Sequence, residues 1–142
     1  DVDIPNEGEE GVLLSIGGRF GGLSLYVQNR LLVFDYNYVG LNHTTITSQE
    51  EVPTGASILG FSFDKTAEAD LKNHTSATGI GTLYINGAEV GRGIISPTIP
   101  VRYPTEEGLE IGTDRLTPVT ESYKSPYKFS GTLKKVVLES KA

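Results

Sequence analysis

The sequence contains no cysteine, and this absence excludes disulfides, thiolate zinc sites and a cysteine nucleophile from the chain. No apolar run approaches the ~20 residues that a helix needs to span a bilayer. No signal peptide is recognised, although a leader could have been removed upstream of Asp1. The lack of cysteine is compatible with either side of a membrane, and we favour a periplasmic or secreted location over a cytoplasmic one.

Basic residues are also scarce. The 12 lysines and arginines stand against 18 aspartates and glutamates, so the formal net charge is −6. Apart from Lys134-Lys135, the basic residues are scattered along the chain. Phosphate contacts require clustered lysine and arginine, so we expect neither nucleic acid nor an anionic membrane as a partner.

The composition favours a single β domain. The chain has 142 residues, which is enough to bury a core without disulfides or metals. Its apolar content of 37% is low and its 17 glycines are many, which suits a β protein with many turns better than a helical bundle. Residues 1–10 are acidic and polar and are predicted to be a linker or a frayed N-terminus. Residues 11–142 then form one domain.

Residues 17–40 contain the clearest structural signal. Two apolar runs, residues 23–27 and 31–39, flank the polar break Gln28-Asn29-Arg30, in which Asn29 tolerates a positive φ. The first run alternates apolar and polar residues with period two, which is typical of a half-buried strand. These runs predict a β-hairpin. Asn86-Gly87 predicts a second hairpin, because both residues adopt the positive φ of a type I′ turn.

The rest of the chain reads as further short strands. We expect strands at residues 11–17, 41–52, 56–64, 79–86, 88–95, 109–111 and 131–139. The strand at 56–64 is apolar at most positions, so we expect it at the centre of its sheet. Residues 65–78 are predicted to be a loop with one helical turn. Gly79-Ile-Gly81 and Gly91-Arg-Gly93 are predicted to mark bends or bulges. About nine strands separated by turns predict an all-β, antiparallel two-sheet sandwich or jelly roll.

Few residues suggest chemistry. His43 and His74 lie in polar segments without a local carboxylate to orient them, and each follows an asparagine of a glycosylation-type triplet, Asn42 or Asn73. Whether these two triplets are ever modified is left open. Surface-exposed histidines without a role are the simpler interpretation.

Two further alternatives rest on acidic and aromatic residues. Glu110 and Asp114 share parity on one strand, as the carboxylates of sandwich glycosidases do, but no third acid completes that site. Asp114 is also a calcium candidate, because it opens a loop rich in carbonyl groups. The tyrosines, Tyr36 and Tyr38 among them, could stack on sugar rings or form ordinary cross-strand pairs.

Three stretches, residues 17–38, 81–93 and 111–138, together resemble the C-terminal β-sandwich of bacterial arylsulfatases. In that family a glycine-flanked segment leads into a Leu-Tyr-Val hairpin that ends in Tyr-Asn, as Leu25-Tyr26-Val27 and Tyr36-Asn37 do here. A later series of motifs is matched in order by Gly112, Asp114, Pro118-Val119, Tyr123, Pro126-Tyr127 and Phe129-Ser130-Gly131. The resemblance implies a fold of the concanavalin A/laminin G group.

The resemblance also implies what this chain lacks. Sulfatases of this type use a formylglycine made from the first residue of a Cys/Ser-x-Pro-x-Arg motif, beside a calcium ion. The motif is missing here, since Ser96-Pro97 and Ser125-Pro126 have the wrong spacing. The resemblance therefore implies a non-catalytic domain with no cofactor of its own. Its expected partner is the sulfatase catalytic domain of the same polypeptide, which acts on a sulfated glycan or aryl sulfate.

Residues 17–22 and 114–123 are the expected contact with that catalytic domain. Arg19 and Phe20 are predicted anchors, because arginine and aromatic residues are enriched at interface hot spots. The remaining domain-contact or ligand candidates are Tyr36, Asn37, Asp114 and Tyr123. One alternative is a free-standing carbohydrate-binding module of the lectin or laminin G type. A second is a small sandwich glycosidase, and fold analogy alone does not choose among the three.

Overall fold

The computed structural model describes residues 1–4, 9–18, 21–38, 42–67, 78–95, 109–114, 118–120, 122–125 and 127–137. Within these ranges the regular elements are all β-strands, and no helix is found. The strands are β1 (Val2–Ile4), β2 (Gly11–Gly18), β3 (Gly21–Gln28), β4 (Leu31–Tyr38), β5 (Asn42–Glu51), β6 (Gly55–Ser57), β7 (Leu59–Ala67), β8 (Thr78–Ile85), β9 (Ala88–Ile95), β10 (Leu109–Ile111) and β11 (Thr132–Leu133).

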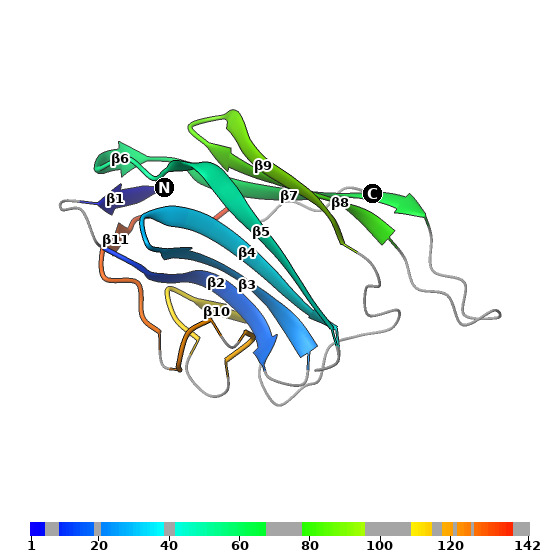
Figure 1. Ribbon diagram of the computed structural model, residues 1–142. Coiled ribbons are helices and arrows are strands. Elements are labelled where there is room, and N and C mark those ends of the chain that lie inside the picture. Colours follow the sequence, from blue (N-terminus) through cyan, green and yellow to red (C-terminus); the bar gives the residue numbers. More distant parts are fainter. Residues whose placement is uncertain are drawn as a thin grey trace.

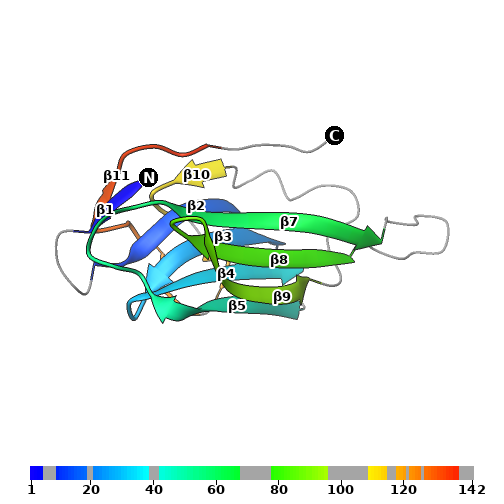
Figure 2. The same ribbon diagram turned by 90° about the horizontal axis from the view of Figure 1, so that it is seen from above.

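The strands form three antiparallel sheets (Figure 1). The largest has the order β10-β2-β3-β4-β5, and two three-stranded sheets have the orders β7-β8-β9 and β11-β1-β6. Seen from above, β7, β8 and β9 lie across the five-stranded sheet (Figure 2). The all-β, antiparallel class predicted from the sequence is thus confirmed. A single isolated parallel bridge, between Val12 and Lys128, departs from the antiparallel pattern.

Both predicted hairpins are confirmed. Strands β3 and β4 pair around Asn29 and Arg30, which have φ values of 52° and 68°. Strands β8 and β9 pair around Asn86 and Gly87, with φ values of 51° and 82°. These left-handed conformations match the twist of the flanking strands, which explains why asparagine and glycine stand at three of the four positions.

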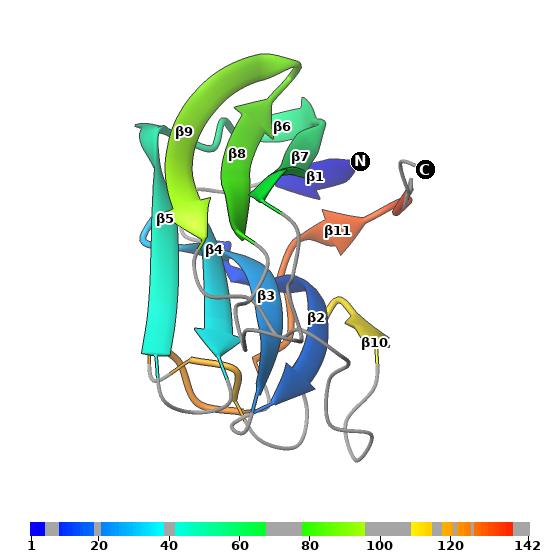
Figure 3. The same ribbon diagram turned by 90° about the vertical axis from the view of Figure 1, so that its right-hand side faces the viewer.

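The inner face of the five-stranded sheet carries the main hydrophobic core. The β3–β4 register places Leu25 opposite Phe34 and Leu23 opposite Tyr36 on this face. Phe34 stacks on Phe61 of β7, with ring centroids 3.8 Å apart. Apolar residues of β4, β5, β8 and β9 complete one buried cluster with them. The core therefore lies between β7-β8-β9 and the five-stranded sheet (Figure 3).

Glycines allow the two layers to approach closely. A Cβ atom on Gly93 would lie 2.9 Å from Cγ1 of Ile46, and one on Gly81 would lie 2.9 Å from Cδ1 of the same side chain. Register shifts lie beside Gly79 and Gly91, so the predicted bulges are confirmed there. Gly81 and Gly93 pair with each other inside regular strands, where the same prediction is wrong. They make room for the β5 isoleucine instead.

Other predictions need correction. Val2 and Ile4 are buried in β1, which pairs with β6 and β11, so this part of residues 1–10 is not a frayed end. The apolar stretch 56–64 divides between β6 and β7, and β7 lies at the edge of its sheet rather than at the centre. The last strand is limited to Thr132–Leu133. Most of the predicted loop with a helical turn, residues 68–77, lies outside the described residues.

Candidate functional site

The outer face of the five-stranded sheet carries polar side chains that are nevertheless buried. The register places Ser24 of β3 beside Ser15 of β2 on one side and Asp35 of β4 on the other. All three residues have an exposed fraction of 0%. Described residues between 112 and 129 lie along this side of the sheet, away from β7, β8 and β9 (Figure 1). A connection without regular strand structure therefore covers a polar sheet face.

Tyr26 and Asp35 form the first hydrogen-bonded pair beneath this cover. The Tyr26 hydroxyl donates to Oδ2 of Asp35 at 2.5 Å. Thr45 of the neighbouring strand β5 donates its hydroxyl to the other oxygen, Oδ1. Both oxygens of this fully buried carboxylate thus have donors, as buried charged groups require.

Asp114 and Tyr123 form a second pair, which belongs to the covering connection itself. The Tyr123 hydroxyl donates to Oδ2 of Asp114 at 2.5 Å and forms a hydrogen bond with the Ser24 hydroxyl at 2.9 Å. The same Oδ2 accepts the Val119 backbone N–H at 3.0 Å. These bonds hold residues 114, 119 and 123 together and attach them to β3.

Three further side chains attach the connection to the sheet. Asn37 Nδ2 donates to the carbonyls of Gly18 at 3.2 Å and Val119 at 3.0 Å. Ser15 donates its hydroxyl to the Thr113 carbonyl at 3.1 Å, and Gln28 donates its amide to the Ser122 carbonyl at 2.8 Å. We call these hydrogen bonds, together with those of the Tyr26–Asp35 and Asp114–Tyr123 pairs, the outer-face network.

Aromatic rings fill the space next to the network. Tyr26 meets Tyr123 edge-on with ring centroids 5.1 Å apart, and Tyr127 stacks on Tyr123 at 4.9 Å. Burial, and then the hydrogen bonds to Asp35 and Asp114, raises the pKa of Tyr26 and of Tyr123 far above the ordinary value. Both phenols therefore stay protonated and serve as hydrogen-bond donors at neutral pH.

The structure brings three of the sequence-predicted candidates together. Asn37, Asp114 and Tyr123 all belong to the outer-face network, with exposed fractions of 1%, 0% and 6%. Tyr36 lies on the opposite, inner face, where it is part of the hydrophobic core. Its ring is thus not placed for stacking on a sugar. Arg19 and Phe20 lie outside the described residues.

Among the described side chains, the groups considered for catalysis or metal binding are not brought together into a site. Asp114 is directed at Val119 and Tyr123, and nothing is described of the Glu110 side chain. His43 is exposed on β5, and His74 lies outside the described residues. Among the described residues there is no group of three or more His, Cys, Asp or Glu side chains that could hold a metal ion. The described residues therefore do not form the predicted calcium site around Asp114.

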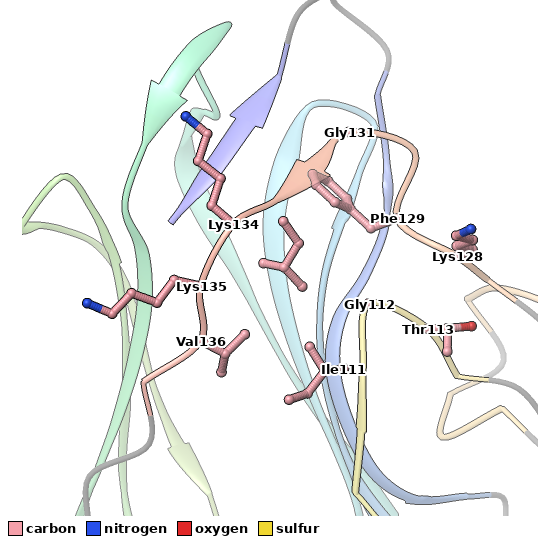
Figure 4. A pocket seen from close by; sticks show the side chains of 10 residues that line it. Ile111, Gly112, Thr113, Lys128, Phe129, Gly131, Lys134, Lys135 and Val136 are labelled. Carbon is pink, nitrogen blue, oxygen red and sulfur yellow. The ribbon is translucent and has the colours of Figure 1, made fainter.

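A cavity of about 720 Å³ lies between the end of β10 and residues 128–136. Figure 4 shows Ile111, Phe129 and Val136 directed into the space between these two segments, and Lys134 and Lys135 extending from its rim. Lys128 also lines it. The cavity thus has an apolar floor and a basic rim, a combination that the sequence patterns did not reveal, because its two walls come from separate short segments.

A second cavity, of about 280 Å³, lies on the other side of residues 133–137. It opens between the inner face of the five-stranded sheet and β7, and its lining is mostly aliphatic and aromatic. Leu133, Lys135 and Val136 line both cavities. Residues 133–136 therefore lie between the two cavities.

Comparisons of the chain with protein-family models, curated proteins and solved structures found no match. In the part of the chain that the structure describes, no helix has the length and apolar character needed to cross a membrane.

Proposed function

We propose that this chain is the non-catalytic C-terminal accessory domain of an arylsulfatase-like sulfuric ester hydrolase. It packs on the catalytic domain of the same polypeptide and shapes the access of a sulfated glycan or aryl sulfate to the active-site cleft. Its architecture in this proposal is a two-sheet sandwich or jelly roll of the concanavalin A/laminin G group.

The observation that carries the proposal is the position of the residues that resemble the family. Asn37, Asp114, Val119 and Tyr123 come from separate motifs, yet they share one set of hydrogen bonds. The Phe129 N–H also donates to the Gly112 carbonyl at 2.9 Å, which links the first and last motifs of the later series. The ordered motifs thus correspond to one physical unit, the covering connection and its attachment to the sheet, and this makes a chance match less plausible.

The same bonds support a structural rather than a catalytic role. A general acid or nucleophile needs access to a substrate, but Asp35 and Asp114 have exposed fractions of 0% and face phenol hydroxyls. In addition, the sequence lacks the Cys/Ser-x-Pro-x-Arg motif that gives rise to formylglycine. The proposal accordingly assigns sulfate ester hydrolysis, and the calcium ion it uses, to the partner domain.

The packing of the layers supports the proposed architecture. The stacked pair Phe34–Phe61 and the contacts of Ile46 with Gly81 and Gly93 join the inner faces of two sheets. Two antiparallel sheets that bury their apolar faces against each other are the defining feature of a sandwich.

The proposal is tested with the gene that encodes residues preceding Asp1. We expect a Cys/Ser-x-Pro-x-Arg motif upstream, sulfatase activity of the longer polypeptide on 4-methylumbelliferyl sulfate, and none from residues 1–142 alone. Arg19→Ala with Phe20→Ala should lower the stability or raise the KM of the longer polypeptide, while Lys124→Ala, at an exposed site, serves as the control. An upstream sequence without the motif would overturn the sulfatase assignment.

A further inference from the structure

The cavity beside β10 combines an apolar interior with a basic rim, as a peptide-binding groove can. Its interior is formed by Ile111, Phe129, Leu133 and Val136, whereas its three lysines stand at the rim. Ile111 is 51% exposed, so its side chain is accessible to a ligand in the cavity. At about 720 Å³ the cavity is within the size range of small-ligand and peptide pockets.

An open strand edge borders this cavity. Strand β10 is the last strand of its sheet, and β11 is the last strand of the sheet that it forms with β1 and β6. The Gly112 N–H donates to the Leu13 carbonyl, on the side of β2. Because hydrogen-bonded pairs alternate in an antiparallel ladder, the N–H and C=O of Ile111 point away from β2. The described residues supply no partner for these two groups.

The rim is basic in a chain that is otherwise acidic. Residues 122–137 contain four lysines and no carboxylate, whereas the whole chain has a net charge of −6. Among the described residues, Lys134 approaches Asp3 at 4.0 Å, and neither Lys128 nor Lys135 takes part in an ion pair. An occupant with acidic groups at its margin would therefore be attracted to this rim.

We propose that this cavity binds an extended peptide segment in which apolar and acidic residues alternate, and that the segment adds a strand to the open edge of β10. Its backbone pairs with the N–H and C=O of Ile111, and its apolar side chains contact Ile111, Phe129 and Val136. Its carboxylates lie near the lysines of the rim. Backbone pairing gives affinity in this binding mode, and the alternate side chains give specificity.

The chemistry of the lining favours a peptide over a glycan. Sugar hydroxyls require acceptors as well as donors around them, but the lysines at the rim only donate and the floor of the cavity is aliphatic and aromatic. The open N–H and C=O of a strand edge, in contrast, are matched by another strand. The proposal does not depend on the sulfatase assignment, since a partner of any origin could carry such a segment.

The test uses residues 1–142 and a fluorescent peptide of about eight residues with alternating glutamate and valine, measured by fluorescence anisotropy. We expect saturable binding that weakens as salt rises. Peptides with N-methyl groups on only one backbone edge provide the sharpest comparison. Blocking the edge that faces β10 should abolish binding, whereas blocking the other edge should leave it intact. Equal binding of the two N-methylated series would overturn strand addition.

Two pairs of variants locate the site. Lys135→Glu should weaken binding about threefold at low salt, whereas Lys124→Glu, in the same basic segment but outside the cavity lining, should change it little. Val136→Asp should weaken binding about tenfold, and Val137→Asp, which does not line this cavity, should not. Circular dichroism confirms that each variant is folded.

Three further results would overturn the proposal. The first is the absence of peptide binding at millimolar concentration. The second is equal loss of affinity with Lys124→Glu and Lys135→Glu, which would indicate a general charge effect. The third is displacement of the peptide by a sulfated oligosaccharide or an alkyl sulfate at lower concentration than by unlabelled peptide, which would assign the cavity to an anionic glycan or amphiphile instead.

Discussion

The inner and outer faces of the five-stranded sheet are both buried, but by different means. The inner face presents Leu23, Leu25 and Phe34 to β7-β8-β9, and apolar packing holds the layers together. The outer face presents Ser24 and Asn37 to residues 113–123, and directed hydrogen bonds hold the cover in place. Packing tolerates small shifts, whereas a buried hydrogen bond requires a partner at one position.

This contrast has a functional consequence. Groups that could act on a substrate, namely the Asp35 and Asp114 carboxylates and the Tyr26 and Tyr123 phenols, all belong to the outer-face network. The Tyr26–Asp35 pair joins two strands of the sheet, the other pair joins two parts of the covering connection, and none of the four groups is exposed to solvent. A partner would therefore bind elsewhere, and the cavity beside β10 lies at one edge of this sheet.

The largest effect is expected from the inner face. Phe34→Ala removes a ring that is 2% exposed and stacked on Phe61, so the free energy of unfolding should fall by about 3–5 kcal/mol. Chemical denaturation followed by far-UV circular dichroism measures it, with Phe34→Leu as the milder control. A loss below about 1 kcal/mol would mean that the two layers do not share a core.

The outer face should show a smaller effect with a different pattern. Asp35→Ala leaves the Tyr26 and Thr45 hydroxyls without their acceptor, so the free energy of unfolding should fall by about 1–3 kcal/mol. Adding Tyr26→Phe should recover part of this loss, because the unpaired phenol hydroxyl is then gone. No recovery would indicate that volume rather than hydrogen bonding matters at this face.

High pH should weaken the outer face selectively. Burial first, and then the bond to the neighbouring aspartate, raises the pKa of Tyr26 and Tyr123. A raised pKa in the folded state means that the stabilisation is complete below the unfolded pKa near 10 and declines as pH rises beyond it. The loss should be about 1.4 kcal/mol per pH unit for each tyrosine.

Denaturation curves between pH 9 and about pH 11 measure this slope. Tyr26→Phe and Tyr123→Phe should each reduce it, while Tyr84→Phe, on the β8 strand outside the network, is the matched control. The same slope in all three variants would contradict the role given to the two buried phenols.

A substitution in the β8–β9 turn, which belongs to neither face of the five-stranded sheet, gives a reference value for the loss of unfolding free energy. Gly87→Ala places a Cβ atom where no atom lies within 4 Å, but at a φ of +82°. Only backbone strain is expected, so the free energy of unfolding should fall by about 1 kcal/mol. Thermal denaturation is sufficient to measure it. A loss as large as that of Phe34→Ala would show that the β8–β9 hairpin controls the layer packing.

Much of the fold could be predicted from local patterns. The hairpins at Asn29-Arg30 and Asn86-Gly87 followed from turn residues and period-two alternation, which act over a few neighbours. Strand β1 could not be predicted, because its apolar residues, Val2 and Ile4, are flanked by acids. Its partners β6 and β11 are far away in the sequence.

The candidate site was only partly predictable. Asn37, Asp114 and Tyr123 were singled out through the resemblance, and the structure places them together, although buried. Ser24 and Asp35 were missed. A strand with alternating polar residues predicts a solvent-exposed face, and the same pattern is produced by a polar face that a distant connection covers. The closest local signal was that a tyrosine and an aspartate lie nine residues apart in two places, at Tyr26 and Asp35 and at Asp114 and Tyr123.

The central claim is that hydrogen bonds of the outer-face network hold the covering connection on the sheet. A double-mutant cycle between Ser24 of β3 and Tyr123 of the connection tests it most directly, with Ser24→Ala, Tyr123→Phe and the double variant measured by chemical denaturation. We predict a coupling energy of about 1 kcal/mol, since the Tyr123 hydroxyl forms a hydrogen bond with the buried Ser24 hydroxyl at 2.9 Å. Additive losses, with a coupling energy near zero, would contradict the account.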